Sequence, residues 1–272
     1  MKKLLILSVL TFLLVGCSKQ MSDPTYSNLV DDKMIESISE KLVANGVSSS
    51  QVETFKKQLS NFYDTVGTEN MVSDFESIKE PTYDPYTLQD KWLSKNNYVG
   101  YNCRITSYTL YKDLFQGNGF DENSTSHLLF DYETLNQDKF SQDDINKFNT
   151  LFQSFDTENA KDLKVHKENI KNGFKKYGFK FADSNIKLVS VYLHDQVIKP
   201  DTDILFVGHT GILIEEKDEL LFIEKLAFSE PYQVVKFSDL NQLAEYLLNK
   251  YDFSDGQPEA RPIITLNDSF LN

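Results

Sequence analysis

Apolar residues recur three and four positions apart between Tyr26 and Val66, with polar residues between them. This spacing predicts amphipathic helices that bury one face. Asn45-Gly46 ends the first of these helices, and the serines at 48–50 can cap the start of a second. We therefore expect a helical hairpin that covers the rest of the domain.

The central part of the chain continues the helical pattern. Its clearest helix starts at Cys103, carries apolar residues along one face and is closed by Gly117. The expected helices span residues 88–93, 103–115, 141–155 and 158–177, and loops are expected at 80–87 and 121–138.

The pattern changes after residue 185, where short runs rich in β-branched and aromatic residues alternate with brief polar turns. Such short connections favour antiparallel hairpins over parallel crossovers. The expected strands are 186–193, 203–207, 210–215, 219–227 and 232–237, followed by a helix at 238–251. Helices first and strands later predict an α+β fold, in which a helical N-terminal part packs on a C-terminal antiparallel sheet. We expect one domain over residues 26–272.

The first seventeen residues indicate a cellular location. Lys2 and Lys3 precede an apolar stretch at 4–15, which is too short to span a bilayer and is typical of a signal peptide. The stretch ends in Leu14-Val15-Gly16-Cys17, which resembles the lipobox of bacterial lipoproteins. That resemblance implies a signal peptide at 1–16, lipidation of Cys17, a tether at 17–25 and a lipid anchor at the extracytoplasmic face of the cell membrane. The alternative is an ordinary secretory signal with an incidental cysteine.

Charge and missing motifs narrow the classes of partner. The formal net charge of −13 argues against nucleic acid and anionic lipid headgroups, because both would repel the chain. The sequence contains no His-Glu-x-x-His, no Cys-x-x-Cys and no glycine-rich phosphate loop. We therefore expect no metal and no cofactor, and contact with the membrane only through the lipid anchor.

Cys103 is the strongest candidate for chemistry. If lipid occupies Cys17, Cys103 has no disulfide partner in the chain, because the sequence has two cysteines. At the start of a helix, free N–H groups and the helix dipole favour a thiolate, which is a nucleophile for acyl transfer. The alternative is a buried structural cysteine, since cysteine is among the most buried residue types.

A nucleophilic cysteine needs a base, and His209 is the best placed of four histidines. It lies in Gly-His-Thr-Gly between two apolar runs, where small neighbours leave room for the ring. Glu224 interrupts an apolar run fifteen residues later and fits the next strand of a hairpin, from which it could orient the imidazole. The alternatives are a turn histidine and a solvent-facing glutamate. The other histidines are His127 in a polar loop, His166 on an exposed-looking helix and His194 at a strand end.

A cysteine at a helix start, a histidine in His-x-Gly-Ile and a polar residue on the next strand resemble the papain-like cysteine peptidases and amidases. That resemblance implies a papain-like fold with Cys103, His209 and Glu224 as catalytic residues. Two features depart from it. Gln89 lies fourteen residues before the cysteine, too far for the usual oxyanion-hole glutamine, so that Asn102 or backbone groups would serve, and the third member is a glutamate.

A second resemblance covers most of the chain after the signal peptide. Tyr101–Arg104 and Gly208–Gly211 resemble motifs of a streptococcal-type lipoprotein family of unknown function. Two hypotheses follow. The first is a surface-anchored cysteine amidase or peptidase that cleaves peptide or cell-wall amide bonds. The second is a non-catalytic binding or adhesion lipoprotein on the same fold. A rim of tyrosines near a groove would suit either hypothesis, and the candidates are Tyr98, Tyr101 and Tyr108.

Overall fold

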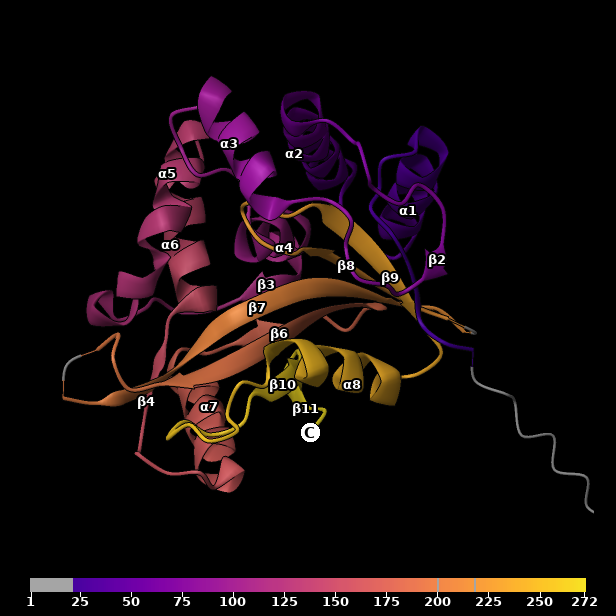
Figure 1. Ribbon diagram of the computed structural model, residues 1–272. Helices are drawn as coiled ribbons and strands as arrows, with labels where there is room; N and C mark the ends of the chain where they lie inside the picture. Colours follow the sequence, from indigo (N-terminus) through magenta and orange to yellow (C-terminus); the bar gives the residue numbers. More distant parts are fainter. Residues whose placement is uncertain (1–21, 200, 218) are drawn as a thin grey trace, which may run out of the picture.

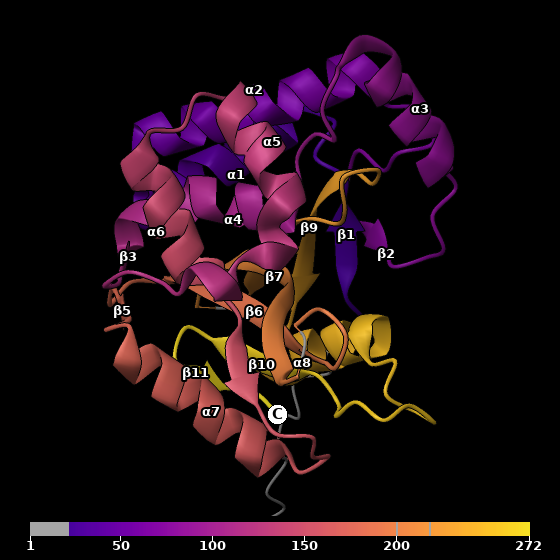
Figure 2. The same ribbon diagram turned by 90° about the vertical axis from the view of Figure 1, so that its left-hand side faces the viewer.

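The computed structural model describes residues 22–199, 201–217 and 219–272. A long antiparallel sheet lies at the centre of the molecule (Figure 1). Helices α1 to α6 cover one face of this sheet, α8 lies on the opposite face, and α7 packs beside β4 at one end (Figures 1 and 2). This arrangement confirms the expected α+β fold, with a helical N-terminal part packed on a C-terminal antiparallel sheet.

The helices are α1 (Asp32–Ala44), α2 (Ser49–Val66), α3 (Pro85–Lys95), α4 (Cys103–Tyr111), α5 (Leu129–Gln137), α6 (Gln142–Phe152), α7 (Leu163–Lys176) and α8 (Leu240–Tyr251). Short 3-10 turns lie at Lys112–Leu114, Glu122–Ser124 and Ser126–Leu128. The hairpin of α1 and α2 is confirmed. Ser48 caps α2 in a reciprocal capping box with Gln51.

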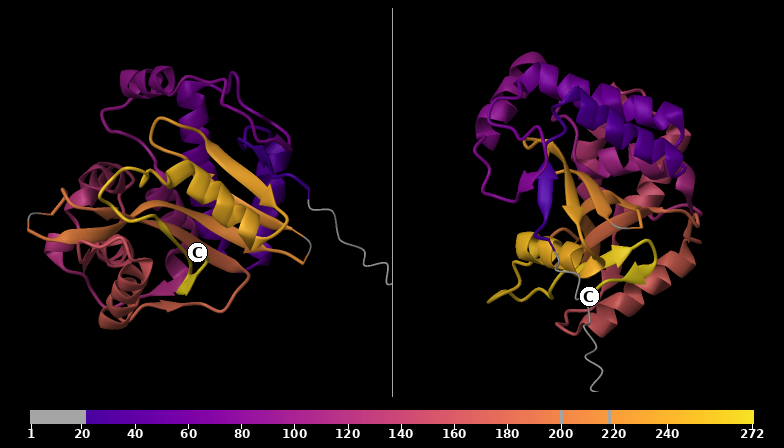
Figure 3. Two further views of the ribbon diagram at one scale, coloured as in Figure 1. Left: turned by 60° about the horizontal axis from the view of Figure 1, so that its bottom comes forward. Right: turned by 90° about the vertical axis from the view of Figure 1, so that its right-hand side faces the viewer.

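The strands are β1 (Thr25–Ser27), β2 (Glu76–Ser77), β3 (Phe115–Gln116), β4 (Phe155–Thr157), β5 (Lys180–Phe181), β6 (Ile186–Asp195), β7 (Asp203–Glu215), β8 (Leu220–Lys225), β9 (Tyr232–Phe237), β10 (Ile263–Leu266) and β11 (Ser269–Phe270). The main sheet has the order β11-β10-β6-β7-β8-β9-β1-β2, with β4 also paired to β7, and β3 pairs with β5 separately. Figure 3 shows α8 lying across this sheet, over the strands that carry the candidate site.

The prediction of a loop at 121–138 is wrong, because α5 occupies the second half of that segment. The first turn of α5 departs from the usual pattern: Leu129 and Phe130 are exposed, whereas Asp131 is fully buried, as is Thr134. No side chain caps the start of α5 either. Without a cap and with apolar residues on its exposed side, this segment gives only a weak sequence signal of a helix.

The two strands expected at 203–207 and 210–215 form one continuous strand, β7. Val191 pairs with His209 and the next residue, Tyr192, pairs with Val207, so that Gly208 is the extra residue of a β-bulge. A bulge admits one additional residue without ending the strand. His209 therefore lies inside a strand, and the bulge beside it changes the direction of the chain locally.

The expected tyrosine rim is wrong. Tyr98 and Tyr108 are buried in the core, and Tyr101 is also buried, although it lines a pocket. No helix within the described residues is long and apolar enough to cross a membrane. Cys17, the signal peptide and most of the tether lie outside the described residues.

Candidate active site

The site lies where β7 and β8 separate. The two strands pair from Ile212–Ile223 to Glu215–Leu220 and no further, although β8 continues to Lys225 in its ladder with β9. His209 and Glu224 lie just beyond the last paired residues and are almost completely buried. His209 Nε2 forms a hydrogen-bonded ion pair with Glu224 Oε2, which joins the two strands across the split.

Cys103 reaches the same place from the helical layer. It is the first residue of α4, a helix that packs against β7 and β8. The Cys103 thiol lies close enough to the His209 ring for the two groups to shift each other's pKa. Because Nε2 of His209 bonds Glu224, Nδ1 is the ring nitrogen left for the thiol. The structure thus brings together the three residues that the sequence analysis singled out.

The ionisation of the three groups is coupled. Burial raises the pKa of the Cys103 thiol, but the neighbouring His209, with the charge of Arg104, outweighs burial and lowers it. Burial disfavours the imidazolium, yet Glu224 and Cys103 raise the pKa of His209 to about 9. Burial likewise opposes the Glu224 carboxylate, and His209 lowers its pKa to about 2. These directions favour a thiolate–imidazolium pair beside a carboxylate.

Glu224 has two further partners that fix its carboxylate. Gln233 lies directly opposite Glu224 in the β8–β9 ladder, and its Nε2 donates to Glu224 Oε1 at 2.6 Å. Tyr246 of α8 donates its hydroxyl to the same oxygen at 2.7 Å. The Tyr251 ring stacks on the His209 ring, with 4.5 Å between the ring centres. The interpretation of Glu224 as solvent-facing is therefore wrong.

Asn102 and Arg104, on either side of Cys103, are both held by Asp131 of α5. Asn102 Oδ1 accepts from the Ile105 N–H at 2.9 Å and Nδ2 donates to Asp131 at 2.7 Å, so that this amide caps α4. Arg104 donates to both Asp131 oxygens, at 3.1 and 2.7 Å, and to the Val207 carbonyl at 3.1 Å. Asp131 thereby fixes the start of α4 against β7. Sequence reasoning missed this residue because its segment was expected to be a loop.

The groups available for an oxyanion are mainly backbone groups. Within the described residues, the first-turn N–H groups of Cys103 and Arg104 have no acceptor. Asn102 keeps one N–H after its bond to Asp131. Gln89 lies on α3, which packs on α2, and none of the hydrogen bonds of the site involves it. The structure therefore places Asn102 beside the cysteine and Gln89 on a different helix.

The other three histidines are bound to structural partners. The expectation that His166 is exposed is wrong: it is fully buried, its Nε2 donates to the Ala160 carbonyl at 2.6 Å, and its ring lies 4.7 Å from that of His194. His194 accepts from the Ala260 N–H at 2.9 Å, so its other nitrogen donates to Asp203. The remaining histidine, His127, donates to the Phe152 carbonyl at 3.0 Å.

Lys225, the residue after Glu224, is also fully buried. Its ammonium donates to the Ala227 carbonyl at 2.6 Å and to the Glu230 carbonyl, and it lies 3.8 Å from the centre of the Phe62 ring. Burial lowers the pKa of Lys225, whereas the carbonyls and the ring stabilise its charge. These contacts of Lys225 hold the turn between β8 and β9 next to the site.

Fold and site together define an α+β protein that carries a buried Cys–His–Glu arrangement at the start of a helix. A family model described as a domain of unknown function (DUF4300) matches residues 25–271, and the chain belongs to this family. No curated protein and no solved structure matches the chain. The expected membership in a family of unknown function is thus confirmed, and the match carries no information on lipid anchoring or on a papain-like activity.

Proposed function

We propose that this protein is a cysteine amidase or peptidase of papain-like type that cleaves amide bonds in peptides or cell-wall peptides. Cys103 is the nucleophile, His209 the general base and acid, and Glu224 the residue that orients His209. The observation that carries the proposal is the buried His209–Glu224 ion pair beside Cys103, which is the first residue of a helix. Nucleophile, base and orienting group are the parts that covalent acyl transfer requires.

The proposed reaction has two steps. The Cys103 thiolate attacks the amide carbonyl carbon, a C–S bond forms, and the carbonyl oxygen takes negative charge beside the first-turn N–H groups of α4. When the C–N bond breaks, the imidazolium of His209 gives its proton to the leaving amine. Water then attacks the thioester while His209 takes its proton, the C–S bond breaks, and a carboxylic acid and the thiolate are released.

One observation favours the second hypothesis, a binding lipoprotein without catalysis. Cys103 is only 6% exposed to solvent, so a substrate carbonyl has little access to its thiol. In that case the same Cys–His–Glu arrangement would only hold the split between β7 and β8 together. Thiol reactivity distinguishes the two functions.

A form of the protein that begins at Ser18 contains Cys103 as its single cysteine, so alkylation reports on that residue alone. We expect iodoacetamide to label it with half-maximal rate at a pH below the ordinary thiol value of about 8.5. A second, smaller change in the labelling rate is expected near pH 9, where the imidazolium of His209 loses its proton. The measurement is the rate of mass increase across a pH series, with the urea-unfolded chain as the reference thiol.

Two variants make this experiment specific. His209→Ala removes the charge that stabilises the thiolate, so its profile is expected to move toward that of the unfolded chain. Glu224→Gln should shift the profile less and in the same direction, because it acts through His209. Labelling that occurs only after unfolding, or a profile indifferent to His209, would rule out the enzyme and leave the binding protein.

We also propose that Cys17 is lipidated and that the protein is anchored at the extracytoplasmic face of the cell membrane. The lipobox-like sequence Leu14-Val15-Gly16-Cys17 supports this proposal. Cys17→Ser is expected to release the protein from the membrane fraction or to stall its processing, as measured by fractionation and by the mass of the mature chain. Unchanged processing and membrane association in the Cys17→Ser protein would refute the anchor. Cys103→Ser is the matched control and should leave both unchanged.

A further inference from the structure

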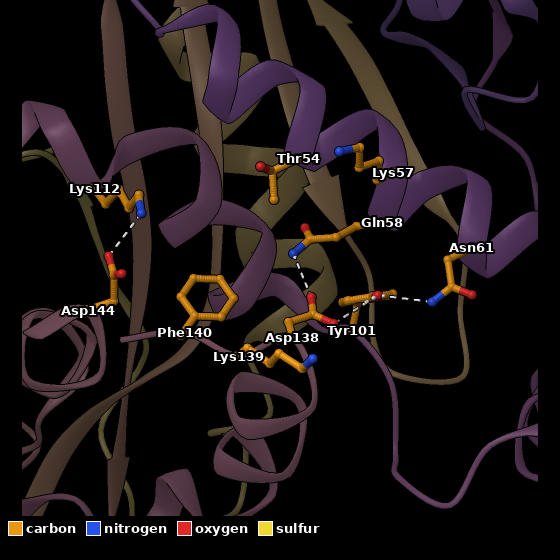
Figure 4. Close-up of a pocket in the computed structure, with 10 residues that line it drawn as sticks. All are labelled: Thr54, Lys57, Gln58, Asn61, Tyr101, Lys112, Asp138, Lys139, Phe140 and Asp144. Atoms are coloured by element: carbon orange, nitrogen blue, oxygen red, sulfur yellow. Dashed lines mark hydrogen bonds and ion pairs between the residues drawn. The ribbon is translucent and has the colours of Figure 1, made fainter. Parts of the chain in front are cut away.

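A pocket of about 450 Å³ lies between α2, the start and end of α4, and the connection from α5 to α6. We propose that it binds a zwitterion: the free ammonium and carboxylate groups of an amino acid or short peptide. Figure 4 shows the polar side chains of α2 along one side, with Asp138, Lys139 and Phe140 facing them. The proposal does not depend on catalysis by Cys103.

Asp138 supplies the negative half of the site. Its partners are neutral donors at long range, Gln58 Nε2 at 3.3 Å and the Tyr101 hydroxyl at 3.4 Å, with Asn61 donating to that hydroxyl at 3.0 Å. Among the described residues, no lysine, arginine or histidine forms an ion pair with Asp138. Burial raises the pKa of Asp138, which an arriving ammonium group would reverse. The carboxylate is thus oriented and lacks a cation.

Lys57 and Lys139 supply the positive half. Both are exposed side chains that line the pocket, and neither has an acidic partner within the described residues. The third lysine, Lys112, is already paired with Asp144 at 2.9 Å and contributes no net charge. The pocket therefore presents one unpaired carboxylate and two unpaired ammonium groups.

This arrangement disfavours ligands of a single charge. An anion would gain from the lysines but be repelled by Asp138, and a cation would face the opposite imbalance. A zwitterion satisfies both halves, and the Phe140 ring at the pocket wall offers an apolar contact for the atoms between the charged ends. Amino acids and short peptides with free termini have this charge distribution.

The experiment is calorimetric titration of the full chain with trialanine and with its N-acetyl, C-amide and doubly blocked forms. We expect saturable binding of trialanine at concentrations below about 10 mM, and a loss of about tenfold in affinity when either end is blocked. Asp138→Asn should abolish the difference between trialanine and its N-acetyl form. Lys57→Gln with Lys139→Gln should abolish the difference between trialanine and its C-amide.

Two controls separate this site from general effects. Lys175→Gln removes an exposed lysine of α7, a helix outside the pocket lining, and should leave binding unchanged. Cys103→Ala should bind trialanine normally. Loss of the proposed catalytic activity can therefore be distinguished from loss of binding in this pocket. If Asp138→Asn does not fold, the variants of the exposed Lys57 and Lys139 still test whether the pocket recognises the carboxylate of the ligand. No saturable binding, equal binding of the blocked forms, or binding of only the cationic or only the anionic form would overturn the proposal.

Discussion

Asp131→Asn is expected to lower the free energy of unfolding by about 3–5 kcal/mol, the usual cost of breaking a buried ion pair from one side. Asp131 is fully buried, and the Arg104 side chain is 12% exposed, so the arginine would keep its charge in the interior without a counterion. The substitution also replaces one of the two acceptor oxygens by an NH2 donor, so that a bond from Asn102 or from Arg104 is lost as well. The start of the helix that carries Cys103 would therefore lose the ion pair and be held less firmly against α5.

Urea unfolding at neutral pH measures this effect. Glu76→Gln is the matched control, because it breaks the exposed pair with Lys79 and should cost less than about 1 kcal/mol. Replacing Arg104 and Asp131 together by Met and Leu should recover part of the loss, since no unpaired charge then remains. If Asp131→Asn is no more destabilising than Glu76→Gln, the ion pair does not hold α4 in place.

The three residues of the candidate site could be anticipated because each has a strong local signal. Cys103 follows a cap residue at a clear helix start, His209 lies among small residues between apolar runs, and Glu224 interrupts an apolar strand. Hairpin spacing then predicts that His209 and Glu224 lie on neighbouring strands, and the structure places them there. Their roles in a reaction remain a proposal.

The supporting residues could not be predicted in the same way. Tyr246 and Tyr251 come from α8, and nothing in their own segment indicates which strand residues they meet. Asp131 is a buried acidic residue in a helix whose first two apolar residues, Leu129 and Phe130, are exposed. Gln233 is the exception: it is a polar residue in an apolar strand, and the hairpin register places it opposite Glu224. Long-range contacts between segments leave no local periodicity, which is why the fold was easier to predict than the network around the site.

Glu224→Gln is expected to destabilise the protein by about 3–5 kcal/mol, with a characteristic dependence on pH. Folding lowers the pKa of Glu224 from 4.5 to about 2, so its contribution is complete above pH 4.5 and is lost as the pH falls toward 2. Folding raises the pKa of His209 from 6.5 to about 9, so its contribution is complete below pH 6.5 and is lost as the pH rises through 9. Both groups contribute fully only between pH 4.5 and 6.5. The difference in the free energy of unfolding between the native protein and the variant should be largest in that range.

Urea unfolding of the native protein, Glu224→Gln, His209→Gln and the double variant across pH 3–10 tests this expectation by a double-mutant cycle. The coupling between the two positions should peak between about pH 4.5 and 6.5 and fall on both sides. Glu76→Gln, which changes an exposed carboxylate, should show a small difference without such a maximum. A coupling that stays constant across the whole range would mean that the pair is held by packing rather than by charge. The imidazolium would then not be stabilised by Glu224, and the lowered pKa of the Cys103 thiol would lose its main cause.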